Sequence, residues 1–375
     1  MVTAAPHPTA APGFDASDPA SSAFRDAVAS AISGFLDDRA SQLAAIGPEL
    51  DPVLDMARQF TGGGKRLRPA FCYWGYAAVA HQPDDPAALL RACASLDLLH
   101  VSALVHDDVM DSSDTRRGLP AAHRQFEQLH DEMDGLGHHL TFGRAGAILL
   151  GDLLIMWSAQ LLSESGLDAT TLAAATPLID AMRTEVTAGQ FLDMLAQHAP
   201  LSGEIVESLA LSERVVEFKS ARYTVQRPVQ FGAALAGGTD EVVTGLADFG
   251  SPLGRAFQFR DDVLGVFGDE SVTGKPAGDD LREGKRTVLV AHALAEAEPR
   301  EAAELQSLLG NVDLDEAQIG RAREIITGSG ARERVESMIE TGLETALAAL
   351  DRLPLRAEGR LALRSLAVAA VRRDF

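Results

Sequence analysis

The sequence of 375 residues is poor in aromatic residues and in positive charge. Aromatic residues make up 5% of the chain, while Ala and Leu are frequent, a composition that favours helices over strands. The formal net charge of −21 argues against a nucleic-acid-binding protein, which needs a basic face. An acidic protein that binds anions must use local clusters of basic residues, a divalent metal ion, or both.

Cysteines and long apolar runs are also scarce. Cys72 and Cys93 lie in apolar stretches, so we expect two reduced thiols in the core and neither a disulfide framework nor a zinc site. The first residues lack the charged and apolar pattern of a signal peptide, and no uninterrupted apolar run reaches 18 residues. We therefore expect a cytoplasmic protein without stable membrane insertion.

The pattern of apolar residues is helical through most of the chain. Residues 1–20 are Ala, Pro and small polar residues, which predicts a disordered tail. From residue 21 to 375 no linker divides the chain and no series of short alternating runs predicts a sheet, so we expect one all-α domain. The expected helices include 89–110, 143–162, 169–196, 203–226, 241–267, 287–309 and 331–350.

One segment interrupts this pattern. Residues 128–142 carry His130, His138 and His139 among Gly and acidic residues and are interpreted as a surface insertion. A metal role for these histidines is one interpretation, but no ligand spacing repeats, so a solvated loop is the simpler one.

Two aspartate clusters follow apolar helices. Asp107, Asp108 and Asp111 close the run 89–110, and Asp107 and Asp111 share one helix face because they are four residues apart. A solvated acidic helix end would explain the charge but not the choice of Asp over Glu. Short carboxylates suit Mg²⁺, which takes oxygen ligands and keeps water and phosphate as partners. A second pair, Asp261 and Asp262, ends another apolar helix, so both clusters can face one cavity.

Basic residues cluster near these carboxylates. Three glycines, Gly62 to Gly64, precede Lys65, Arg66 and Arg68, and glycines allow backbone amides to approach an anion closely. The spacing is not that of a Walker A loop. Arg116 and Arg117 follow the first Asp cluster, and Lys275, Lys285 and Arg286 follow the second. These segments could be flexible turns or charge-balancing loops, but together with the carboxylates they indicate sites for two diphosphates.

At these residues the chain resembles the trans-prenyl diphosphate synthases of the polyprenyl synthetase family. The resemblance covers roughly residues 27–373, apart from the segment 128–142. Its motifs occur in the family's order: Gly-Gly-Lys-Arg-Leu-Arg-Pro from Gly63, Asp-Asp-Val-Met-Asp from Asp107 with Arg-Arg-Gly after it, Gly151–Asp152, Gln190 with Asp193, Lys219, and the block 258–286. The resemblance implies an all-α bundle around a deep central cavity, the isoprenoid synthase type I fold, usually as a homodimer.

The resemblance also implies a reaction and its residues. The family joins an allylic diphosphate (dimethylallyl, geranyl or farnesyl) head to tail with isopentenyl diphosphate, by ionisation, condensation and proton loss. Carried over by position, the residues expected to hold up to three Mg²⁺ ions at the allylic diphosphate are Asp107, Asp108, Asp111, Asp261 and Asp262. The cations expected to bind that diphosphate are Arg116, Lys219 and Lys275, with Lys285 as a further substrate-binding residue. The residues expected to bind isopentenyl diphosphate are Lys65, Arg68, His100 and Arg117. Those expected where the cation forms are Gln190, Ser220 and Gln258.

Two positions depart from the family pattern. The second Asp motif usually has a third Asp four residues after the first, and here that position is Gly265. We expect activity to survive, because the first two carboxylates make most of the metal contact, but the metal affinity on that side is open. Ser220 replaces the family's usual hydroxyl residue after Lys219, a mild change.

Small residues upstream of Asp107 bear on the product length. Bulky aromatics at positions 102 and 103 stop chain growth in farnesyl-type relatives, and this chain has Ser102 and Ala103. The floor of the tail path is then expected deeper, at Leu99 or at Met156 and Trp157 on a neighbouring helix, although core packing explains Trp157 as well. Geranylgeranyl diphosphate (C20) is the expected product. A longer product of C25 or more, or farnesyl diphosphate, is the alternative.

Two other classes of protein are compatible with parts of this pattern. A non-catalytic regulatory subunit of a heteromeric synthase would usually have lost an Asp motif or the basic residues, and both survive here. A class I terpene cyclase shares the fold and an Asp-rich motif but needs no isopentenyl diphosphate site, which the Gly63–Arg68 segment predicts.

Overall fold

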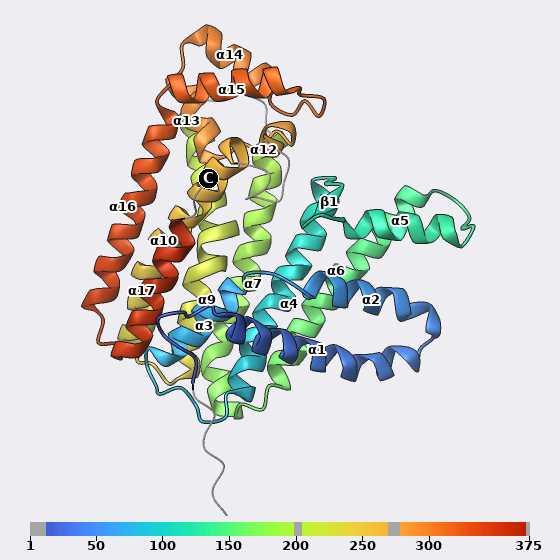
Figure 1. Ribbon diagram of the computed structural model, residues 1–375, viewed down its shortest axis with the longest axis vertical. Helices are drawn as coiled ribbons and strands as arrows, with labels where there is room; N and C mark the ends of the chain where they lie inside the picture. The colour runs from blue at the N-terminus through green and yellow to red at the C-terminus, as the bar shows by residue number, and fades with distance from the viewer. Residues whose placement is uncertain (1–12, 199–204, 269–277, 373–375) are drawn as a thin grey trace, which may run out of the picture.

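The computed structural model describes residues 13–198, 205–268 and 278–372, and these residues form an almost entirely helical protein (Figure 1). The predicted all-α fold is confirmed. One antiparallel pair of two-residue strands, β1 (Thr115–Arg116) and β2 (Leu119–Pro120), closes the turn after the first Asp cluster.

The helices vary from one turn to thirty residues. In the first half they are α1 (Ser22–Ala44), η1 (Pro48–Leu50), α2 (Asp51–Thr61), α3 (Leu67–Ala77), α4 (Ala87–Met110), α5 (Ala122–Glu132), α6 (His139–Ser163) and α7 (Ala169–His198). In the second half they are α8 (Ile205–Val215), the π-helix η2 (Val216–Gln226), α9 (Arg227–Leu235), α10 (Asp240–Phe267), α12 (Asp279–Arg282), α13 (Val288–Glu296), α14 (Pro299–Leu308), α15 (Glu316–Gly328), α16 (Ala331–Arg352) and α17 (Ala357–Val371).

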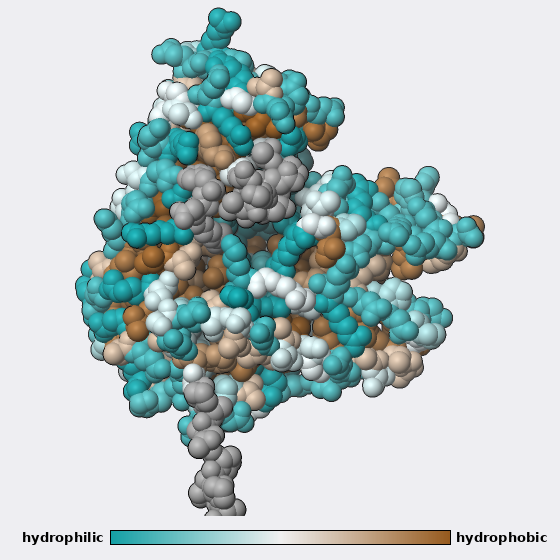
Figure 2. Space-filling model, in the orientation of Figure 1, coloured by the Kyte–Doolittle hydropathy of each residue, from teal (hydrophilic) through white to brown (hydrophobic). Residues whose placement is uncertain are grey.

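Helix α4 lies at the centre because it is apolar on every side. It packs against α6, α1 and α3, and it carries the first Asp cluster at its C-terminal end. By length and composition both α4 and α6 could cross a membrane, but 72% of the most apolar stretch of α4 is buried inside the protein. The corresponding value for α6 is 44%, so α6 exposes part of an apolar face. In Figure 2 the outer ends of the molecule are mainly hydrophilic, and hydrophobic residues show toward the middle of this face.

The predicted helix 203–226 changes its form halfway. Helix α8 gives way at Val216 to the π-helix η2, which packs against α7 and α10. Glycines on both neighbours allow this close approach, because a side chain on Gly189 would meet the backbone of Lys219 and one on Gly254 would meet the backbone of Ala221. The widened turn therefore places Lys219 and Ser220 between two long helices.

Three expectations about organisation need correction. The disordered tail was expected to reach residue 20, but the described residues 13–20 pack on the core: the Phe14 ring lies edge-on to Phe24 and Tyr73, at 5.2 Å from each. The insertion 128–142 is not a single loop, since α5 continues to Glu132 and α6 begins at His139. The expected helix 287–309 is two helices, because the chain breaks at Ala297–Glu298 and restarts with Pro299 in the first turn of α14.

The two cysteines lie where they were expected. Cys72 and Cys93 are both buried in the core and both are free thiols. Burial raises the pKa of the Cys93 thiol well above its usual value, which keeps it protonated and unreactive.

Candidate active site

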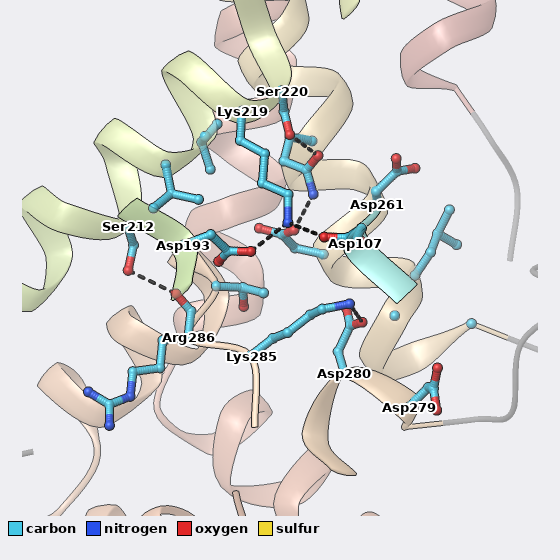
Figure 3. Close-up of a pocket in the computed structure, with 18 of the residues that line it drawn as sticks. Asp107, Asp193, Ser212, Lys219, Ser220, Asp261, Asp279, Asp280, Lys285 and Arg286 are labelled. Atoms are coloured by element: carbon cyan, nitrogen blue, oxygen red, sulfur yellow. Dashed lines mark hydrogen bonds and ion pairs between the residues drawn. The ribbon is translucent and has the colours of Figure 1, made fainter. Parts of the chain in front are cut away.

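A cavity of about 600 Å³ lies between the C-terminal parts of α4, α7 and α10, the π-helix and the residues after α12 (Figure 3). Its polar lining includes Asp107 of the first Asp cluster, both aspartates of the second, and several of the cations that the sequence singled out. These residues are Lys65, Asp107, Arg116, Asp193, Lys219, Ser220, Gln258, Asp261, Asp262, Asp279, Asp280, Lys285 and Arg286.

Lys219 and Asp107 meet at the centre of the cavity. The Lys219 Nζ lies 3.1 Å from Asp107 Oδ1 and 2.5 Å from Asp193 Oδ2, and the Gln190 amide donates to the same Asp107 oxygen at 2.7 Å. Burial opposes ionisation of Asp107, but the charges of Lys219 and other nearby cations outweigh it and hold its pKa below the usual value. Asp107 is therefore ionised and its carboxylate is fixed in direction.

The other two residues of the first cluster have different surroundings. Asp108 is fully buried and accepts hydrogen bonds from the Arg116 guanidinium, whose Nε lies 2.8 Å from Oδ1. Asp108 does not line the cavity, whereas Arg116 does, so this pair aims the Arg116 side chain. Asp111 follows the end of α4, where burial and the charge of Asp107 raise its pKa to about 6.

A chain of hydrogen bonds supports the second cluster. Ser220 Oγ donates to Gln258 Oε1 at 2.6 Å, and Gln258 Nε2 donates to Asp262 Oδ1 at 2.8 Å. The second oxygen of Asp262 is buried and has no hydrogen-bond partner among the described residues. Burial raises the pKa of Asp262 well above the usual value, and the charges of Asp280 and Asp261 add to the effect. Burial thus favours the neutral form of Asp262, and a cation bound beside it would favour the ionised form.

The glycine-rich segment and α4 form a separate basic group. Arg66 stands in the left-handed region with φ 51°, and its buried guanidinium pairs with Asp97 and donates to the Thr61 carbonyl at 2.6 Å. This anchor holds Lys65 and Arg68 on either side of it.

The remaining members of the basic group surround Arg68. The Arg68 guanidinium lies over the Tyr223 ring at 4.1 Å, and the His100 ring lies 6.2 Å from the same ring. Arg117 donates to the Gly63 carbonyl at 3.0 Å. Burial and the charges of Arg68 and Arg117 hold the pKa of His100 well below its usual value, so His100 is neutral at pH 7. Of the four residues expected at the isopentenyl diphosphate, Arg68 and His100 therefore lie at the Tyr223 ring, and Arg117 lies against the glycine-rich segment that carries Lys65.

The carboxylates fit a hard divalent cation. Asp107, Asp261 and Asp262 supply oxygen donors around one cavity, and one oxygen of Asp262 is buried without a hydrogen-bond partner among the described residues. Among the described residues no three acidic, His or Cys side chains already converge on one ion position. An ion here would complete its shell with water and phosphate oxygens, as Mg²⁺ commonly does.

Two further lysines were predicted to bind substrate. Lys275 lies outside the described residues. Lys285 lines the cavity, but it is paired with Glu283 and lies 3.5 Å from Asp280. Asp193, to which the sequence gave no role, is the second partner of Lys219. Its spacing of three from Gln190 on α7 was the available signal.

The residues proposed for chain length lie deeper in the protein. Ser102, Leu99 and Trp157 are buried and Ala103 is partly buried, and the cavity lining stops at Leu104. Met156 does not belong to this set, because 58% of it is exposed.

Comparisons with known proteins agree with this geometry. Residues 51–326 match the family model described as polyprenyl synthetase. The chain belongs to the polyprenyl synthetase family. The geranylgeranyl diphosphate synthase of Saccharolobus solfataricus is 34% identical over 269 residues, which cover 71% of this chain and 74% of that one. The nonaprenyl diphosphate synthase of Mycobacterium tuberculosis is 31% identical over 307 residues, 82% of each chain.

A solved structure extends the similarity to the fold. The geranylgeranyl pyrophosphate synthase of Corynebacterium glutamicum, complexed with isoprenyl diphosphate and magnesium, is 39% identical with a TM-score of 0.89, and the match covers 96% of this chain and 100% of that one. The protein is therefore a trans-prenyl diphosphate synthase with the family's all-α fold. Its relatives differ in the chain length of their products, so family membership alone does not determine the chain length of the product of this synthase.

Proposed function

We propose that the synthase condenses isopentenyl diphosphate with an allylic diphosphate in a Mg²⁺-dependent reaction and makes geranylgeranyl diphosphate as its main product. The observation that carries this proposal is that Asp107 of the first cluster, Asp261 and Asp262 of the second, Lys219, Arg116 and Lys65 all line one cavity. We place the reaction in the cytoplasm, where both diphosphates are soluble.

The carboxylates and the cations would act on the allylic diphosphate. Asp107, Asp111, Asp261 and Asp262 would hold up to three Mg²⁺ ions, with Asp108 holding Arg116 in place. When bound, Mg²⁺ would supply positive charge that stabilises the diphosphate as it leaves. Arg116 and Lys219 reach the same space and would neutralise the rest of that charge.

The basic group would position the second substrate. Lys65, Arg68 and Arg117 are cations on a rigid support, and Arg68 is fixed between Thr224, at 2.8 Å from Nη2, and the Tyr223 ring. They would hold isopentenyl diphosphate while its double bond attacks the allylic cation. Gln190 and Gln258 would present polar groups at that cation. A closed cavity would also protect it from water.

The product length follows from the depth of the proposed tail path. Ser158 Oγ donates to the Ser95 carbonyl at 2.7 Å, which places the neighbouring Trp157 beside a residue twelve positions before Asp107. At about 1.5 Å per residue this is about 18 Å of helix. Extended isoprene units of about 5 Å each, from ordinary carbon–carbon bond lengths, would fill that depth with four units. Trp157, edge-on to Phe35 at 6.3 Å, would form the floor.

This path requires side-chain movement. Ser102 is fully buried, and its hydroxyl has no hydrogen-bond partner among the described residues. Small side chains at Ser102 and Ala103 would let a tail pass between α4 and α6 after their neighbours shift.

We also propose a homodimer, because α6 presents an apolar stripe at helical spacing. Its exposed members are Ile148, Leu149, Ile155 and Met156, of which Leu149 is 67% exposed. An exposed stripe of this kind is typical of a protein interface. Light scattering should give the mass of a dimer for the wild-type protein and that of a monomer for Leu149→Glu with Met156→Glu.

The decisive experiment for the reaction uses purified protein, Mg²⁺, isopentenyl diphosphate and each of three allylic diphosphates, followed by chromatography of the dephosphorylated products. A C20 alcohol as the main product supports the proposal. A product of C25 or more would contradict the proposed floor. No turnover without a partner would indicate a regulatory subunit, and a cyclic hydrocarbon from the allylic substrate alone would indicate a cyclase.

A further inference from the structure

An ion pair on the π-helix η2 joins residues that are five apart, Glu217 and Arg222. Arg222 Nε donates to Glu217 Oε1 at 2.8 Å. The backbone hydrogen bonds of a π-helix also join residues five apart, so these two side chains stand one turn apart on the same face. In an α-helix, at about 100° per residue, they would lie about 140° apart around the helix axis. The pair therefore favours the π form of this segment over the α form.

Both neighbouring helices hold the same pair. Arg222 Nη1 donates to Glu185 Oε1 of α7 at 2.9 Å, and Ser251 Oγ of α10 donates to Glu217 Oε2 at 2.9 Å. The Arg222 guanidinium also lies over the Phe218 ring, 4.5 Å from its centre. The side chains of Glu185, Glu217 and Arg222 are 16%, 18% and 29% exposed, so solvent screens these charges only in part. The pair thus ties the π-helix to the two long helices between which it lies.

The same stretch of helix presents Lys219 to the cavity. Lys219 lies between the two members of the pair in the sequence and lines the cavity, whereas Glu217 and Arg222 do not. Figure 3 shows Lys219 extending from this helix to Asp107 and Asp193. A change from backbone hydrogen bonds five apart to bonds four apart would turn Lys219 about the helix axis and move its ammonium group away from both carboxylates. The form of the helix therefore decides where this cation stands.

From this geometry we propose that Glu217 and Arg222 are positioning residues of the synthase: their ion pair selects the π form of the helix and thereby holds Lys219 in the cavity. They act through Lys219 and not on the substrate. The glycines of α7 and α10 allow the helix to approach its neighbours closely, but a small residue permits the widened turns without selecting them. The ion pair distinguishes the two helical forms. The inference rests on the proposed role of Lys219 at the departing diphosphate.

Steady-state turnover of the full-length protein tests the proposal, because the ion pair can be removed without changing a residue that lines the cavity. Glu217→Gln keeps the size of the side chain and removes its charge. It should lower kcat about tenfold or more, since a displacement of about 1 Å near the reacting atoms can cost about 100-fold in rate. The matched control is Glu213→Gln, which removes a carboxylate from the preceding α-helical turn, where Glu213 lies 3.7 Å from Arg255 of α10. This control should change kcat less than about twofold, because its pair does not depend on the π form.

A double-mutant cycle with Lys219→Ala separates positioning from a general structural role. Adding Glu217→Gln to Lys219→Ala should lower kcat less than about twofold further, because the group to be positioned is already absent. General damage to the helix would lower kcat by the same factor with and without Lys219. Thermal unfolding of each variant checks that it is folded.

The spacing of the pair can be tested at constant composition. Exchanging the two neighbours, as Glu217→Phe with Phe218→Glu, places the acid four residues before Arg222, which is the spacing that suits an α-helix. The net charge is unchanged and an ion pair can still form. The value of kcat should nevertheless fall at least as far as in Glu217→Gln.

The outcomes that overturn the inference are specific. Wild-type kcat in both Glu217→Gln and the exchanged variant would show that the pair does not position Lys219. Equal factors in the two backgrounds of the cycle would leave Glu217 with a structural role only. Normal turnover in Lys219→Ala would refute the role of Lys219 on which the inference rests, and this result is distinct from an unchanged Glu217→Gln.

Discussion

The buried pair of Arg66 and Asp97 offers a sharp test of how the basic group is held. Both side chains are nearly inaccessible, at 2% and 7% exposure, and Arg66 also donates to the Thr61 carbonyl. Replacing Arg66 with Met removes the partner but leaves the Asp97 carboxylate buried. Loss of one partner from a buried ion pair costs about 3–5 kcal/mol, because the remaining charge is uncompensated. We expect Arg66→Met to lower the free energy of unfolding by about that amount.

The loss should depend on pH in a defined direction. Burial raises the pKa of Asp97 above its usual value, against the opposing charges of Arg66, Arg68 and Arg117. Removing Arg66 raises that pKa further. A carboxyl whose pKa is raised in the folded state lowers stability once the pH exceeds its unfolded pKa, because the unfolded chain releases the proton more readily. The destabilisation should therefore be larger at pH 8 than at pH 5.

Urea unfolding of the wild-type and variant proteins at both pH values measures this effect. Adding Asp97→Leu to Arg66→Met should recover at least half of the loss, since no buried charge then remains. The KM for isopentenyl diphosphate should rise about tenfold in Arg66→Met, because Lys65 and Arg68 lose their common anchor. If Arg66→Met lowered the free energy of unfolding by less than about 1 kcal/mol, and equally at both pH values, the assigned role of the pair would be refuted.

Three further predictions concern the cavity, the product and a distant charge network. Lys219→Ala should lower kcat by about 10²–10³-fold with an unchanged circular dichroism spectrum, because a fixed cation leaves the site of developing charge; normal turnover would contradict its role. Ser102→Phe should shorten the product and Trp157→Ala should lengthen it, as read by chromatography of the dephosphorylated alcohols, and unchanged lengths would place the tail elsewhere. Glu185→Gln should lower the free energy of unfolding by about 1–3 kcal/mol at pH 7, as measured with urea, because the Glu185 carboxylate accepts hydrogen bonds from Arg227 at 2.6 and 2.8 Å. Burial raises the pKa of Glu185, but its arginine partners outweigh this and hold the pKa below its usual value. That stabilisation should persist above about pH 4.5 and fade only below it, and a difference in unfolding free energy that stayed constant to about pH 3 would contradict the assignment.

Much of the fold could be predicted because its signals are local. The predicted helix 89–110 begins two residues after the observed start of α4, and the predicted helix 241–267 begins one residue after the observed start of α10. Helix periodicity depends on residues three and four apart, which sequence displays directly. The prediction of one continuous helix over 287–309 was wrong, because the helix is interrupted before Pro299 although the apolar pattern continues.

The π-helix could not be predicted in the same way. Its widened turns depend on Gly189 of α7 and Gly254 of α10, which lie far from Lys219 in the sequence but against its helix in space. The packing of Phe14 on Phe24 and Tyr73 has the same character, because composition alone predicted a tail there. Close approach between distant segments is a property of tertiary packing.

The sequence by itself determined the chemistry of this synthase: two Asp clusters, a glycine-rich basic segment and long apolar helices to carry them. The tertiary structure alone decided which charges act together. It paired Asp108 with Arg116 and set Lys219 between Asp107 and Asp193. The physical reason is that a carboxylate's pKa and partners depend on burial and on charges a few ångströms away, and those neighbours come from helices distant in the chain.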